Sequence, residues 1–310
     1  MKVGQTSCTG RGYGYRRRQR GVEDPMDFVS EDNITDIAMK RWATAKNPRL
    51  ATIMKALIKH LHAFAREVEL TPEEWIAGIQ WITAVGQISD EKRMEAILAS
   101  DVFGLSMLVV MMNGRLPEAA TPPTVLGPFH IDGSPEFDKD SDISEGVGGE
   151  KLYVSGMVRG MDGKPIANAM LDVWQADAEG AYEAQIGAEE YLRGIFRTDG
   201  EGRYGLWTIA PKGLRHPMDG PVGDLISKTE ISHYRPAHFH AIVAAKGYQP
   251  VITHLFRQGA PYLENDVVFG VREPLITPFK RHEPGPAPGG KVMREPYATV
   301  EYDFVLAPAA

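Results

Sequence analysis

The hydrophobic pattern of the chain changes once, and this change divides the sequence in two. Within residues 34–115, apolar residues recur every three or four positions and form a helical stripe: Ile53, Leu57, Leu61, Phe64 and Val68. Residues 117–150 are rich in proline, glycine and acidic residues. Beyond them, short β-branched and aromatic runs alternate with turn signals such as Asp162-Gly163. The sequence therefore predicts a helical domain over residues 31–118 and a mainly β domain, an antiparallel sandwich or barrel, over residues 119–310.

Capping signals predict where individual helices begin and end. Residues 71–74 read Thr-Pro-Glu-Glu, a capping box with proline at the first helical position, so a helix should begin there. Asp101 is expected to cap a further helix that runs through Leu105 and Leu108 and ends at Gly114.

Composition excludes several classes of protein. The formal net charge of −7 argues against a nucleic-acid-binding body, which needs a basic face. Cys8 is the single cysteine, so the chain forms no internal disulfide, and a reducing cytoplasmic location is expected. No apolar run approaches the length of a membrane span. Residues 1–30 hold five arginines between positions 11 and 20, several glycines and almost no apolar run, and are predicted to be a disordered tail.

A histidine pair is the first sign of chemistry. His238 and His240 precede an apolar run, residues 241–245, that should form a strand. Alternate residues of a strand share one face, so the two imidazoles should project together, as metal ligands do. Structural histidines are the alternative for this pair taken alone.

Two longer motifs resemble the intradiol catechol dioxygenases. The second half of the chain carries them in the order of that family: Val154-x-Gly156-x-Val158, Gly163, Ile166, Leu171-Asp172-Val173, Gly180-x-Tyr182 and then Arg235-Pro236-Ala237-His238-x-His240. The resemblance implies a non-haem Fe(III) centre held by Tyr182, His238 and His240, in a β-sandwich domain. It also implies that the helical domain forms a homodimer interface, often with a bound phospholipid.

Further motifs are similar to the hydroxyquinol 1,2-dioxygenases within that family. They are Asp172-Val173-Trp174-Gln175, Pro261-Tyr262-Leu263, Val268-Phe269-Gly270-Val271 and His282-Glu283-Pro284-Gly285. This resemblance implies a substrate pocket lined by Leu98, Asp101, Val125, Leu126, Gly127, Pro128, Phe129 and Val268. Taken without it, the apolar members of this set would be core residues and Asp101 a helix cap.

The resemblance also implies a reaction. Both atoms of O2 would be inserted into hydroxyquinol or a related catechol, giving a diacid of the maleylacetate or cis,cis-muconate type. Arg235 would stabilise negative charge that develops on the ring, with help from His254. A surface ion pair is the alternative for Arg235.

One position departs from the family pattern. A second tyrosine ligand is expected 24 residues before His238, where this chain has Leu214, which can neither bind a metal nor accept a proton. His216 could take over as a fourth ligand or general base, water or hydroxide could fill the position, or the enzyme could use another substrate or Fe(II). His216 could equally be a surface residue. A zinc hydrolase and a non-catalytic binding module are the alternative classes.

Overall fold

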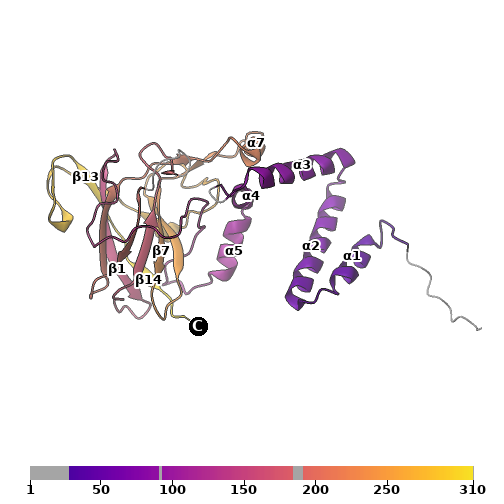
Figure 1. The fold of residues 1–310 in the computed structure, drawn as a ribbon, viewed down its shortest axis with the longest axis horizontal. Helices are drawn as coiled ribbons and strands as arrows, with labels where there is room; N and C mark the ends of the chain where they lie inside the picture. Colours follow the sequence, from indigo (N-terminus) through magenta and orange to yellow (C-terminus); the bar gives the residue numbers. More distant parts are fainter. Residues whose placement is uncertain (1–27, 91–92, 184–190, 310) are drawn as a thin grey trace, which may run out of the picture. The chain divides into compact units, whose positions relative to one another are not determined.

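The chain forms two units. The computed structural model describes residues 28–90, 93–183 and 191–309 (Figure 1), so most of the predicted tail lies outside the described residues. The units comprise residues 1–76 and 77–310. The predicted domain limits at residues 30 and 118 stay predictions.

The first unit is helical. It contains α1 (Ile34–Trp42), α2 (Pro48–Glu67) and the beginning of α3 (Pro72–Ile88). Asn47 caps α2, because its side chain accepts hydrogen bonds from the backbone N–H groups of Arg49 and Leu50. The predicted capping box at the start of α3 is confirmed: Glu74 N–H donates to Thr71 Oγ1 at 3.2 Å, and Thr71 N–H donates to Glu74 Oε2 at 2.9 Å.

Two short helices follow in the second unit, α4 (Glu95–Val102) and α5 (Leu105–Asn113). The predicted cap at Asp101 is wrong, because Asp101 lies inside α4 with its side chain buried. Gly104, with φ of +71°, occupies the N-cap position of α5, a conformation that glycine adopts without steric cost. α5 ends at Gly114 as predicted. Among the described residues, no single helix has the length and apolar character to cross a membrane. α4 and α5 reach that length and apolar character only when taken together, and the pair is bent by 78°.

Two five-stranded sheets form the β-sandwich. The first has the order β10-β13-β1-β14, with β4 on the other edge of β1; its strands are β1 (Lys151–Gly160), β4 (Arg203–Ile209), β10 (Lys280–His282), β13 (Tyr297–Glu301) and β14 (Phe304–Leu306). The second has the order β3-β2-β7-β8-β9, formed by β2 (Met170–Trp174), β3 (Arg193–Arg197), β7 (His238–Ala244), β8 (Val251–Arg257) and β9 (Ile276–Thr277). The remaining short elements are β5 (Leu214–Arg215), α7 (Pro221–Ile226), β6 (Tyr234–Arg235), η1 (Glu273–Leu275), β11 (Gly285–Pro286), η2 (Pro288–Gly290) and β12 (Val292–Met293).

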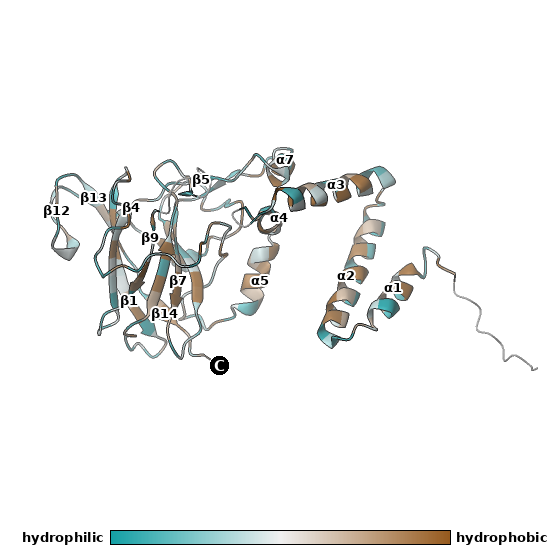
Figure 2. Cartoon of the chain, viewed as in Figure 1, coloured by the Kyte–Doolittle hydropathy of each residue, from teal (hydrophilic) through white to brown (hydrophobic). Residues whose placement is uncertain are grey.

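The mainly β fold is confirmed, but the sheets are mixed rather than purely antiparallel. β1 pairs in parallel with both β13 and β14, because the last strands of the chain return along the edge of β1 that β4 leaves open. Apolar side chains of both sheets meet between them and form one core. In Figure 2 brown, hydrophobic segments lie along strands of both sheets, among them β7. The core includes Leu152, Val154, Leu171, Val173, Leu206, Phe239, Ala241, Val243, Leu255 and Phe304.

Candidate metal centre and aromatic pocket

Three electron-pair donors converge at the end of the second sheet. His238 and His240 lie two residues apart on β7, and both are buried on the same face of the strand, as predicted. Tyr182 follows β2 through a turn in which Asp177 Oδ1 accepts the backbone N–H of Ala181. The Tyr182 hydroxyl lies 2.8 Å from Nε2 of His240 and 3.5 Å from Nε2 of His238, and the two Nε2 atoms are 3.1 Å apart.

These separations fit the coordination shell of a metal ion. Bonds of about 2.1 Å place neighbouring ligand atoms about 3.0–3.4 Å apart at octahedral or tetrahedral angles. His238 donates its Nδ1–H to the carbonyl of Pro236 at 2.7 Å, which leaves the electron pair on Nε2 for the centre. Burial, together with nearby positive groups, holds the pKa of His238 and of His240 well below its ordinary value, so both imidazoles are neutral donors. Two imidazoles and a phenolate form a donor set that suits iron.

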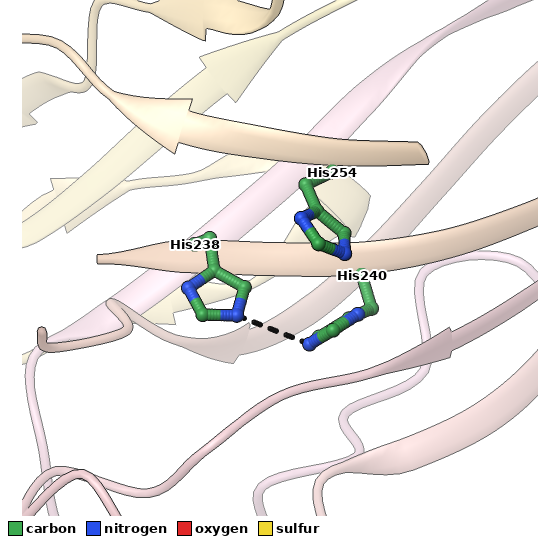
Figure 3. A group of neighbouring side chains, drawn as sticks. All are labelled: His238, His240 and His254. Carbon is green, nitrogen blue, oxygen red and sulfur yellow. Dashed lines mark hydrogen bonds between the residues drawn. The ribbon is translucent and has the colours of Figure 1, made fainter. Parts of the chain in front are cut away.

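His254 lies beside this pair but is tied to another group. It faces His240 from the neighbouring strand β8, and Figure 3 shows its ring next to the two rings of β7. One ring nitrogen from each of the three histidines lies within 4.8 Å of the others. Nδ1 of His254 accepts a hydrogen bond from Nη2 of Arg235 at 3.4 Å. The ring therefore supports the guanidinium group of Arg235, as well as adding a third imidazole to the cluster.

Arg235 is a buried cation fixed by a carboxylate that the sequence did not reveal. Its Nε lies 3.0 Å from Oδ1 of Asp266, and its Nη2 lies 3.3 Å from Oδ2. Its Nη1 lies 3.1 Å from Nε2 of His238. Because Arg235 is only 6% exposed, the alternative of a surface ion pair is wrong. Asp266 is 31 residues away in the sequence, and no motif pointed to the pairing.

A small pocket opens beside these groups. Its free volume is about 20 Å³, room for about one water molecule, so wall side chains must move apart when an aromatic ring enters. The lining residues are Leu98, Asp101, Gly127, Pro128, Phe129, Tyr182, Leu214, His216, Pro217, Arg235, His240 and Val268. The structure thus brings most of the expected site residues together, and Pro217 is an addition.

Two expected pocket residues lie behind the wall. Val125 is buried in the apolar cluster that contains Leu98 and Val268. Leu126 packs against the cluster that contains Trp174, Tyr182 and Leu214. Both support side chains that line the pocket.

Leu214 lies in a short two-stranded ladder rather than in an open loop, and His216 directly follows that ladder. Leu214 of β5 is the register partner of Arg235 in β6, and its side chain reaches the pocket wall. His216 is 2% exposed, so the alternative that it is a surface residue is wrong.

Asp101 is the acidic group of the pocket wall. Burial raises the pKa of its carboxyl group from 3.8 to about 6, while a hydrogen bond from Ser106 and the positive charge of Arg235 act in the opposite direction. Its position inside α4, one turn after Leu98, places both side chains on the pocket side of that helix.

Buried rings and charges hold the candidate metal ligands in place. Phe129 stacks on Tyr182 with ring centroids 4.4 Å apart, and Trp174 stacks on His240 at 4.6 Å. Next to Tyr182 in the chain, Glu183 forms a buried ion pair with Arg193. Burial raises the pKa of Tyr182, and the charges of Arg235 and Arg193 oppose that shift.

Comparisons with known proteins agree with this geometry. Residues 125–308 match the family model described as dioxygenase, and residues 47–121 match the model of the catechol dioxygenase N terminus. The chain is 43% identical over 285 residues to 6-chlorohydroxyquinol 1,2-dioxygenase of Cupriavidus pinatubonensis, covering 91% of this chain and 99% of that protein. It is 40% identical over 281 residues to hydroxyquinol 1,2-dioxygenase of Nocardioides simplex, covering 90% of this chain and 96% of that protein.

Solved structures give the same result. The crystal structure of hydroxyquinol 1,2-dioxygenase from Pseudomonas putida superposes with a TM-score of 0.82 at 39% identity, covering 90% of this chain and 99% of that one. The chain therefore belongs to the intradiol ring-cleavage dioxygenases, which are non-haem iron enzymes. Within that family it groups with the hydroxyquinol 1,2-dioxygenases, and the resemblance seen in the sequence motifs is confirmed.

Proposed function

We propose that this protein opens the ring of hydroxyquinol, or of a closely related catechol, between its two adjacent hydroxyl groups and incorporates both atoms of O2. The product is a diacid of the maleylacetate or cis,cis-muconate type. The observation that carries the proposal is the convergence of Tyr182, His238 and His240 beside a buried arginine, in a chain about 40% identical to enzymes named for hydroxyquinol.

In this proposal Tyr182, His238 and His240 hold the iron, and the ion supplies the site for diol chelation and the redox chemistry with O2. The oxidation state is Fe(III), because an anionic phenolate oxygen stabilises the harder ion. With one phenolate ligand in place of two, Fe(II) is held more readily here than in a site with a second tyrosine.

The protein side chains around the metal have their own tasks. Leu98, Phe129 and Val268 provide apolar walls that pack on an aromatic ring and exclude water. Arg235 presents a fixed positive charge where negative charge develops on the ring, and Asp266 and His254 hold its guanidinium group in place. This charge needs no reorientation during the reaction, because its hydrogen bonds already exist.

We further propose that the protein is a homodimer formed through its helical segment. α2 carries five large apolar side chains at helical spacing and its C-cap residue adds a sixth, each about half exposed: Leu50, Ile53, Leu57, Leu61, Phe64 and Val68. A second copy, with a phospholipid filling the remaining apolar space, would cover this stripe.

The metal site is tested with two buried tyrosines. We expect iron-loaded protein to show a tyrosinate-to-iron absorption band in the visible range, and Tyr182→Phe to abolish it with loss of bound iron. Tyr204→Phe is the matched control, because Tyr204 is also buried but donates its hydroxyl hydrogen to the carbonyl of Tyr302. If the Tyr182→Phe protein keeps both its iron and its band, the proposed ligand set is wrong.

A further inference from the structure

His216 is a buried histidine that is not among the proposed metal ligands. It follows β5, and its backbone N–H donates to the carbonyl of His233 at 2.7 Å. The side chain is 2% exposed and lines the pocket together with Tyr182 and Arg235. The sequence does not explain why an imidazole occupies an apolar wall.

The hydrogen bonds of the ring define what it can offer. Nδ1 lies 3.1 Å from the carbonyl oxygen of Pro217, which can only accept, so Nδ1 carries the hydrogen. Nε2 is then an acceptor, and it is buried with no hydrogen-bond partner among the residues that the structure describes. Burial, with the charge of Arg235 adding to it, lowers the pKa of His216, so the ring is neutral and keeps this electron pair. A buried acceptor without a partner is destabilising, and a ligand that donates to it recovers that cost.

Other polar groups of the pocket wall already have partners. Arg235 is held by Asp266 and His254, and Asp101 takes a hydrogen bond from Ser106. Leu214 contributes no polar atom. His216 therefore supplies an acceptor that these groups leave to a ligand.

His216 is not part of the histidine cluster at the metal end of the pocket. Among the described residues, the histidines whose ring nitrogens lie within 4.8 Å of one another are His238, His240 and His254, and His216 is outside that group. Its acceptor is thus suited to a part of the ligand that does not bind the metal.

We propose that Nε2 of His216 accepts a hydrogen bond from a ring hydroxyl that does not bind the metal, which makes His216 a specificity-determining residue for trihydroxylated rings. The inference rests on the proposed function, since it takes the ligand of the pocket to be an aromatic diol or triol. It deepens that function by naming the residue that distinguishes hydroxyquinol from catechol.

The test measures binding without turnover. Iron-loaded wild type, His216→Leu and His216→Gln are titrated with hydroxyquinol and with catechol under anaerobic conditions, by visible absorption and by calorimetry. We expect His216→Leu to bind hydroxyquinol about tenfold more weakly, the effect of about 1.4 kcal/mol, and to bind catechol within twofold of wild type. The Gln variant, whose amide oxygen can accept in place of Nε2, should recover part of the loss, whereas a purely structural role would not distinguish the two ligands.

Three results would overturn the inference. They are unchanged affinity of the Leu variant for hydroxyquinol, equal weakening for both ligands, and loss of iron from either variant, which would assign His216 to the metal. If wild-type protein binds neither ligand, the proposed function itself fails. Binding of both ligands by wild type with no effect of the variants removes only the role of His216.

Discussion

Two buried carboxyl groups, one in the pocket wall and one paired with the wall residue Arg235, differ in what surrounds them. Asp101 and Asp266 are both carboxylates that are almost completely buried, at 2% and 6% exposure. Asp266 contacts the guanidinium group of Arg235 directly, whereas the shift at Asp101 is dominated by burial. Replacing each aspartate by the neutral asparagine should therefore change the free energy of unfolding in opposite directions.

Asp101→Asn should stabilise the metal-free protein at neutral pH. Because the folded-state pKa of about 6 lies above the ordinary 3.8, the folded protein binds this proton more tightly than the unfolded chain. The stabilisation from this proton is complete below pH 4 and is lost as the pH rises through 6. Urea unfolding should show the variant more stable by about 3 kcal/mol at pH 7.5, with the difference falling below about 1 kcal/mol at pH 4. A constant difference across this range would contradict the assigned cause.

Asp266→Asn should destabilise the protein, because it leaves the charge of Arg235 buried without its counter-ion. We expect the free energy of unfolding to fall by about 3 kcal/mol. Asp219→Asn is the matched control: Asp219 also pairs with an arginine, Arg93, but its side chain is 72% exposed, and such surface pairs contribute about 0–1 kcal/mol. Equal losses of unfolding free energy in the two variants would show that the buried pair contributes no more to stability than the exposed pair.

At the residue scale, the sequence predicted the site residues that stand at a recognisable spacing or within a family motif. A separation of two residues in a strand placed His238 and His240 on one face, and the family motif added Tyr182 and Arg235. Asp266 could not be predicted, since its pairing with Arg235 depends on how distant segments meet. The burial of His216 was equally invisible, because a short ladder, not hydrophobic periodicity, turns its ring inward.

At the scale of secondary-structure elements, local signals set most helix limits. The capping box at Thr71 and the glycine stop at Gly114 are both found where they were predicted. The predicted cap at Asp101 is wrong because an aspartate before an apolar series resembles a cap, whereas the chain turns at Gly104 and begins the next helix there. The parallel pairing of β1 with β13 and β14 also lay beyond the local pattern, because it depends on the path of the last strands.

The exposed stripe of α2 makes a prediction about assembly. Wild-type protein should sediment as a dimer at micromolar concentration, and Leu57→Glu combined with Phe64→Glu should make it a monomer, because two charges would be buried in the contact. Lys59→Glu, a charge reversal on the same helix at an exposed position outside the stripe, should remain dimeric. A monomeric wild type, or a dimer that survives the double substitution, would show that this stripe is not the interface.

At the scale of the whole molecule, the candidate site combines side chains from the sandwich with side chains from the segments around it. The second sheet carries His238, His240 and His254 on adjacent strands. The segment between β4 and β7, which contains β5 and β6, brings Arg235 and His216 to the same pocket. The replacement of the expected second tyrosine by Leu214 is compatible with the proposed three-ligand centre.

The most direct test of the central claim is the stoichiometry of oxygen uptake by iron-loaded protein given hydroxyquinol, with the product identified by mass. The account predicts one O2 consumed per hydroxyquinol and a ring-opened diacid that carries both oxygen atoms when the reaction is run in ¹⁸O2. Protein that retains its iron and binds hydroxyquinol but consumes no oxygen would contradict the account.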